Sequence, residues 1–177
     1  RLAPVLQRLG WTPRPGESAA VSVARQHLIL ALADLGDPGV IAEAGRRFSA
    51  FLASPSSLPA GIREPVLKVA GSHGGEAAFE ALQRLASSSH DLQEQRSEYV
   101  ALAGAEDAAL AGRALDLALA PSTPTSTGML MIHEVAQRHI DVDAVQAPAG
   151  RARIERGERA GQRRRSDACR LDRHGEE

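Results

Sequence analysis

The sequence has a single cysteine, Cys169, among its 177 residues. One thiol cannot form a disulfide within the chain, so no intrachain cross-link holds the fold. Proteins of oxidising compartments usually carry paired cysteines, and this chain gives no such signal. We therefore expect a cytoplasmic protein.

Aromatic residues are also scarce, at 3% of the chain, although 43% of the residues are hydrophobic. The core must therefore be rich in alanine, a strong helix former whose small side chain lets helices pack closely. A β-sandwich would be expected to use β-branched and aromatic residues instead. The composition predicts an all-α fold.

Long hydrophobic runs are missing as well. No apolar stretch approaches the roughly 18 residues of a membrane-spanning helix, and no signal-peptide pattern opens the chain. The formal net charge of −1 creates no overall field that would attract nucleic acid or an anionic membrane. We expect neither as a partner. Because the sequence starts at Arg1 without an initiator methionine, we expect it to be a piece of a longer polypeptide.

Residues 18–52 have the pattern of two helices folded back on each other. In the first helix, Val21, Leu28, Leu32 and Leu35 recur at helical spacing and should share one face. The segment from Leu28 to Leu35 is apolar almost all the way round, which predicts burial on several sides.

The turn between these helices has a clear chemical signature. Gly36 suits the left-handed position after a helix, Asp37 can cap the next helix, and Pro38 suits its first turn. In the second helix we expect these residues to face inward: Val40, Ile41, Ala44, Phe48, Phe51 and Leu52.

The rest of the chain to His139 continues in the same style. Helical patterns cover residues 1–9, 62–70, 79–86, 91–103, 107–118 and 129–139. Asp91 and Asp107 are expected N-caps. Pro65 is tolerable only in a first turn, so its helix should begin late or be kinked. Residues 11–17 should form a connector pinned by Trp11.

These elements amount to about seven antiparallel helices with a spacing near 40 residues between corresponding helices, which is typical of HEAT-type repeats. We predict a HEAT-like α-solenoid over residues 1–142, with a four-helix bundle as the competing fold. Stacking should bury Leu28, Phe48, Phe51, Val66, Phe79 and Leu82.

Residues 143–177 differ in character. Nine of the twenty arginines lie in this segment, and the apolar periodicity is lost. Such a polar segment cannot offset its ordering entropy by burial, so we expect a disordered tail. An out-of-frame or truncated translation would also explain the change. The segment lacks aromatic residues for base stacking, which argues against a nucleic-acid-binding tail.

Two motifs suggest chemistry but do not fit it. A zincin helix requires His-Glu-x-x-His, whereas His133-Glu134 is followed by Gln137 at the second ligand position and by His139 six residues on. The glycine-rich residues 71–75 follow a helix and lack the Gly-Lys-Ser/Thr ending of a phosphate loop, so we interpret them as an interhelical connector. We predict no catalytic, cofactor-binding or metal-binding residue in this chain.

A family resemblance supplies the functional hypothesis. The residues that carry it are 9–17 (Leu-Gly-Trp-Thr-Pro-Arg-Pro-Gly-Glu), 35–38, 44–48, 62–66, 74–76 and 113–119. From about Leu2 to His139 the sequence resembles the C-terminal helical domain of zinc aminopeptidases of the aminopeptidase N type, on the puromycin-sensitive and endoplasmic-reticulum branch.

The resemblance implies a HEAT-like bowl that covers a catalytic domain, limits which peptides reach the zinc and contacts the far end of the substrate. It also implies that the zinc ligands, the general base and the substrate motif lie upstream, in the catalytic domain of the same polypeptide. The leading hypothesis is therefore a non-catalytic, substrate-gating domain. A stand-alone α-solenoid adaptor that binds a protein or peptide on its concave face is the alternative.

Overall fold

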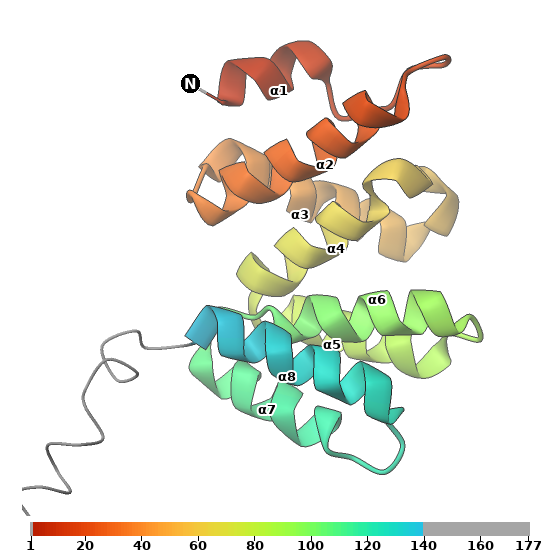
Figure 1. Cartoon of the computed structure of the whole chain (residues 1–177), viewed down its shortest axis with the longest axis vertical. Coiled ribbons are helices and arrows are strands. Elements are labelled where there is room, and N and C mark those ends of the chain that lie inside the picture. Colours follow the sequence, from red (N-terminus) through yellow and green to blue (C-terminus); the bar gives the residue numbers. More distant parts are fainter. Residues whose placement is uncertain (1, 140–177) are drawn as a thin grey trace, which may run out of the picture. The chain divides into compact units, whose positions relative to one another are not determined.

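The computed structural model describes residues 2–139. Within this range the chain forms helices and no β-strand (Figure 1), which confirms the all-α prediction. The α-helices are α1 (Ala3–Leu9), α2 (Ala19–Asp34), α3 (Pro38–Ala53), α4 (Ala60–His73), α5 (Gly75–Ser88), α6 (Leu92–Ala103), α7 (Ala108–Ala118) and α8 (Thr125–His139), with a short 3-10 turn at Pro55–Ser57. The expected domain boundary at 142 and the expected tail, residues 143–177, lie outside the described residues.

The turn between α2 and α3 forms as predicted. Gly36 has a φ of 74°, a left-handed conformation that glycine adopts without steric cost. The Asp37 carboxylate accepts hydrogen bonds from the backbone N–H groups of Gly39 and Val40 at 3.0 and 3.1 Å. Two of the unpaired N–H groups at the start of α3 are thereby satisfied.

The predicted inward face of α2 is confirmed at Leu32 but not at Leu28 or Leu35. The buried face runs through Arg25, Ile29 and Leu32, whereas Leu35 is 74% exposed and Leu28 only half-buried. Because this helix is apolar on nearly every side, periodicity cannot select one face. The contacts with α1, α3 and α4 select it instead.

The predicted face of α3 is largely confirmed. Val40, Ala44, Phe48 and Phe51 are buried, but Leu52 is exposed. Leu52 lies on the rim of an apolar hollow between α3 and α5, where no helix covers it.

Helix α4 begins earlier than predicted, and Pro65 lies in its interior. Proline has no N–H to donate, so the carbonyl four residues earlier, that of Gly61, loses its helical partner. The Gln26 side chain of α2 donates a hydrogen bond to this carbonyl at 2.9 Å. A tertiary contact thus replaces the missing helical bond, which is why the proline is tolerated there.

The predicted connector at residues 71–75 is also mostly wrong, because α4 continues to His73 and α5 begins at Gly75. Gly71 is needed inside the helix for packing. A Cβ atom at this position would lie 1.9 Å from the Ala101 carbonyl oxygen of α6. Helices α4 and α6 therefore approach so closely that only glycine fits.

Both predicted aspartate caps are present. Asp91 accepts from the backbone N–H of Gln93 and Glu94, and Asp107 caps α7 in the same way. The buried face of α8 passes through Gly128, Met131 and Val135, whereas Met129, the first residue of the predicted helical pattern, is exposed. Hydrophobic periodicity misses the N-terminal part of this face because Gly128, which packs against α7, carries no hydrophobic signal.

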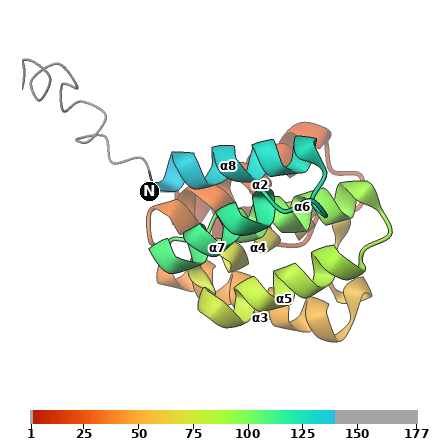
Figure 2. The ribbon, with the colours of Figure 1, turned by 90° about the horizontal axis from the view of Figure 1, so that it is seen from below.

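The helices form two layers in residues 2–139. In one layer α2, α4, α6 and α8 pack successively against one another, and α3, α5 and α7 lie in the other, each against an even-numbered neighbour (Figures 1 and 2). This order of contacts is consistent with the predicted HEAT-like solenoid.

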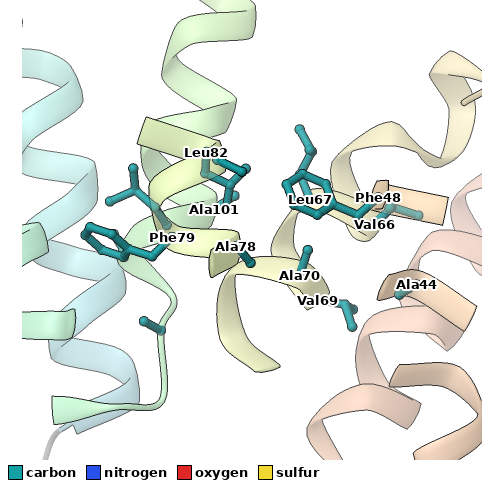
Figure 3. Packing of buried hydrophobic residues seen from close by; sticks show 14 of the residues in the cluster. Ala44, Phe48, Val66, Leu67, Val69, Ala70, Ala78, Phe79, Leu82 and Ala101 are labelled. Atoms are coloured by element: carbon teal, nitrogen blue, oxygen red, sulfur yellow. The ribbon is translucent and has the colours of Figure 1, made fainter. Parts of the chain in front are cut away.

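One continuous hydrophobic core runs through these helices, from Leu6 of α1 to Val135 of α8. Figure 3 shows its middle, where side chains of α3, α4, α5 and α6 come together. Phe48, Val66, Phe79 and Leu82 are buried there as predicted. At the N-terminal end, Trp11 packs against the core, with the Arg47 guanidinium 5.1 Å from the centre of its ring.

Candidate functional site

A charged groove lies across the even-numbered layer and has a volume of about 670 Å³. Its lining comes from the C-terminal parts of α2 and α8, from α4, and from the turn between α6 and α7. The residues are Leu30, Asp34, Lys68, Glu106, Glu134, Gln137, Arg138 and His139. We call this set the charged groove.

Arg138 is the centre of the charged groove. Its Nη2 donates a hydrogen bond to Asp34 Oδ1 at 3.1 Å, and its Nη1 and Nε each lie 3.9 Å from a carboxylate oxygen, of Glu106 and Glu134 respectively. About a quarter of the side chain (23%) is exposed. One guanidinium thus connects α2, α8 and the α6–α7 turn, and its partial exposure leaves it reachable by a ligand.

Two histidines near the groove contact the turn between α6 and α7. His139 Nε2 lies 2.8 Å from the carbonyl oxygen of Ala105; because a carbonyl only accepts, this nitrogen carries the proton. His73 Nδ1 lies 3.4 Å from Glu106 Oε2. Both rings link α4 or α8 to the α6–α7 turn.

The zincin-like residues of α8 have separate partners. His133 Nε2 meets the side-chain nitrogen of Gln137 at 2.9 Å, Glu134 faces Arg138, and His139 bonds to backbone. In residues 2–139 no three His, Cys, Asp or Glu side chains gather in a way that could hold a metal ion.

Sequence reasoning did not find the charged groove. Asp34 and Arg138 are 104 residues apart, and neither belongs to a recognisable motif. Opposite charges on the surfaces of helices are also common and usually only solvate a helix face. Chemically, the groove offers carboxylates and cations side by side, which suits a zwitterionic or peptide ligand.

A second, apolar hollow of about 310 Å³ opens on the odd-numbered side, between α3 and α5. Its lining includes Ile41, Phe48, Leu52 and Val69. Neighbouring helices of the odd-numbered layer therefore stand apart here, whereas α4 and α6 of the even-numbered layer touch at Gly71.

Together these features define an all-α domain of paired helices, with a charged groove on its even-numbered layer. Residues 1–147 match the family model described as the ERAP1-like C-terminal domain. The chain belongs to this family and is a C-terminal domain of the M1 aminopeptidase type. The resemblance found in the sequence is thereby confirmed.

A curated relative extends the comparison. Over 147 residues the chain is 29% identical to aminopeptidase M1-A of Oryza sativa subsp. japonica. The match covers 76% of this chain but only 17% of the relative. The chain thus spans a small part of the length of that aminopeptidase. The helices of residues 2–139 are too short or too polar to span a lipid bilayer.

Proposed function

We propose that this chain is the substrate-gating C-terminal part of a zinc-dependent aminopeptidase and has no catalytic residues of its own. Membership of the ERAP1-like C-terminal domain family is the observation that carries the proposal. The named activity of the rice relative, an aminopeptidase, supports it. The zinc and the catalytic groups would belong to a catalytic domain elsewhere in the same polypeptide.

The even-numbered layer is the face that would meet the substrate. In a curved stack of helix pairs, the layer whose neighbouring helices lie closest is on the inside of the curve. Contacts join α2, α4, α6 and α8 in series, and Gly71 allows backbone contact between α4 and α6. The apolar hollow separates α3 from α5 on the other side. These observations favour a position of the charged groove on the inner, concave surface.

A peptide has charges and hydrogen-bonding groups that complement the charged groove. A peptide carboxylate would interact with Arg138, a planar donor suited to carboxylate oxygens. The amide N–H groups of the peptide, or a basic side chain, would find acceptors in Asp34, Glu106 and Glu134. Gating would follow because only peptides that satisfy these groups reach the zinc in a stable position.

The first test is chemical and genetic. We expect the 177-residue chain to show no peptidase activity on aminoacyl fluorogenic substrates, with or without added zinc. We expect the coding sequence before Arg1 to encode a His-Glu-x-x-His helix with a downstream glutamate, and the joined polypeptide to be an active, chelator-sensitive aminopeptidase. A reading frame without this helix would overturn the proposal in favour of a stand-alone adaptor.

A cytoplasmic location is also part of the proposal and rests on the single cysteine of the chain. Fractionation of cells expressing the natural gene tests it. Recovery of the protein in a secretory or organellar fraction would contradict it.

A further inference from the structure

A third cavity, separate from the charged groove, lies between α4 and α6 and has a volume of about 160 Å³. It is lined by Ala60, Arg63, Glu64, Leu67, Gln93, Glu94, Ser97 and Glu98. We call this set the Glu98 hollow. Along α4 it adjoins the charged groove, since Glu64 of the hollow pairs with Lys68 of the groove at 3.1 Å.

Glu98 is the unusual residue of this hollow. The residue is only 6% exposed, and its Oε2 atom is buried without a hydrogen-bond partner in the part of the chain that the structure describes. Buried carboxylates are normally hydrogen-bonded or paired with a cation, because an unpaired buried charge is costly. Glu98 therefore lacks a partner that a ligand could supply.

Pairing the charged side chains around the hollow leaves one carboxylate without a cationic partner. Arg63 Nη1 lies 2.5 Å from Glu94 Oε1, and Lys68 pairs with Glu64. Each of these ion pairs is neutral as a unit, although the Arg63 Nε atom is itself buried without a hydrogen-bond partner among the described residues. The carboxylate of Glu98 remains, so a single positive charge would balance the site.

We propose that the Glu98 hollow binds a primary alkylammonium group. The Leu67 side chain and the methyl group of Ala60 offer apolar surface for an alkyl stem, and Glu98 accepts hydrogen bonds from the ammonium head. Ser97 Oγ donates to the Gln93 carbonyl at 2.9 Å, which leaves the lone pairs of this oxygen free to accept from the same head group.

The chemistry favours an organic monocation over a metal ion. A divalent cation would need several converging oxygen ligands, and no such group of three carboxylate or imidazole side chains exists within residues 2–139. An ammonium needs fewer acceptors, and its single charge equals the one left over. Lysine side chains and free amines both carry this group.

The acid–base behaviour of Glu98 agrees with this assignment. Burial, assisted by the nearby Glu94 carboxylate, raises the pKa of Glu98 to about 7, and the Arg63 guanidinium opposes the shift. Glu64 is the other titratable group that lines the hollow from α4. A bound ammonium would favour the ionised carboxylate, so ligand and proton compete for Glu98.

The test uses n-butylammonium chloride as the probe, titrated into the full chain and followed by amide chemical shifts. Tetramethylammonium chloride at equal ionic strength is the control, since it cannot donate hydrogen bonds. We expect saturable shifts confined to residues 60–67 and 93–98. With a pKa of about 7, ionisation of Glu98 should make binding about tenfold tighter at pH 8 than at pH 6.

Three variants make the test specific. Glu98→Gln keeps the shape and should abolish the saturable shifts, and Ala60→Met should block them by filling the hollow from its exposed rim. Glu80→Gln, on the surface of α5, should leave binding unchanged. Unchanged binding in Glu98→Gln, equal shifts with tetramethylammonium, or absence of any saturable shift would overturn the proposal.

Two peptides distinguish the sources of the group. Acetyl-Ala-Lys-Ala-amide should produce the same shifts if lysine side chains enter the hollow, and the matched norleucine peptide should not. Binding of n-butylammonium without the lysine peptide would assign the site to free amines. The measurement is of binding by this chain, so it stands or fails independently of the proposed aminopeptidase function.

Discussion

Glu98 places an ionisable group where its charged form is poorly solvated, and its effect on stability has a definite sign. Its pKa is raised in the folded state, so the folded protein holds this proton more tightly than the unfolded chain does. The contribution to stability is therefore full below the ordinary glutamate pKa of about 4.3. It is lost progressively as the pH rises from there through the folded-state pKa of about 7, because the folded protein ionises Glu98 less readily than the unfolded chain does.

We predict that Glu98→Gln stabilises the protein at pH 8, because the amide has no charge to bury. The gain should reach up to about 4 kcal/mol, since the pKa rises from about 4.3 to about 7 and each pKa unit corresponds to about 1.4 kcal/mol. Urea unfolding at pH 5 and pH 8, followed by circular dichroism, measures it. At pH 5 the advantage of the variant should fall to about 1 kcal/mol, because Glu98 is still protonated in the folded protein whereas the unfolded chain is already largely ionised. An equal stability difference at both pH values would contradict this account.

Arg25 is the opposite case, a buried charge that is paired. It is fully buried in α2, where its Nε donates to the Gly10 carbonyl at 2.8 Å and its Nη2 to Glu17 Oε1 at 2.5 Å. The guanidinium also lowers the pKa of the Glu17 carboxyl through this hydrogen bond. Arg25 thus ties both ends of the connector between α1 and α2 to the helix.

We predict that Arg25→Ala destabilises the protein by about 3–5 kcal/mol, since it removes a buried pair member and leaves a cavity. Chemical unfolding monitored through Trp11 fluorescence measures the loss. Arg46→Ala is the control, because the Arg46 side chain is 68% exposed and surface ion pairs contribute about 0–1 kcal/mol. Comparable losses in both variants would show that Arg25 has no special role.

At the scale of helices, the close approach of α4 to α6 depends on Gly71. A methyl group there would overlap the Ala101 carbonyl, so Gly71→Ala should force α4 away from α6 and destabilise the fold by about 1–3 kcal/mol. Gly112→Ala in α7 is a matched control, because a Cβ atom added at Gly112 would have no neighbouring atom within 4 Å. This change should stabilise the helix by about 0.5–1 kcal/mol. Thermal unfolding of both variants gives the comparison, and stabilisation by Gly71→Ala would refute the close approach.

The same scale shows which structural features the sequence can reveal. The caps at Asp37, Asp91 and Asp107 were predictable because a cap depends on neighbours within three residues. Helix faces were less predictable. The buried face of α2 includes Arg25, a charged residue that no hydrophobic pattern selects, and that of α8 includes Gly128.

The predictions of where α4 begins and ends were wrong for a similar reason. Considered locally, Pro65 and Gly71 disfavour a continuous helix. However, the Gln26 side chain donates a hydrogen bond to the Gly61 carbonyl that the proline leaves unpaired, and the close contact with α6 requires a glycine at position 71. Both compensations come from other helices, so they become visible only when the helices are assembled. The all-α class survives such errors because it follows from composition and from several independent helical segments.

At the scale of the whole described unit, the charged groove and the Glu98 hollow share the even-numbered layer and join through the Lys68–Glu64 pair. Neither could be predicted from the sequence. Each combines residues from separate helices. The family resemblance carried by residues 9–17 and 35–38 did indicate a function, but it identified the family without locating a site. Family membership and site geometry are thus independent sources for the functional proposal.

The charged groove gives the gating proposal its sharpest test, in the full aminopeptidase polypeptide that carries this domain. We predict that Arg138→Glu raises the KM for peptides long enough to reach the groove by about tenfold, which corresponds to about 1.4 kcal/mol of lost interaction. It should leave kcat/KM for a single aminoacyl fluorogenic amide unchanged, because that substrate ends near the zinc. Arg138→Lys keeps the positive charge and should raise the KM for long peptides by less than Arg138→Glu does.

Arg84→Glu is the control for net charge, since Arg84 lies on α5 and is largely exposed, away from the even-numbered layer. It should change neither constant. An equal loss for long and short substrates in Arg138→Glu would indicate damage to the fold and not to a peptide contact. Unchanged kinetics for both long and short substrates in Arg138→Glu would show that the charged groove does not contact the substrate. A guanidinium that binds peptide cannot be replaced by a carboxylate without a loss of affinity.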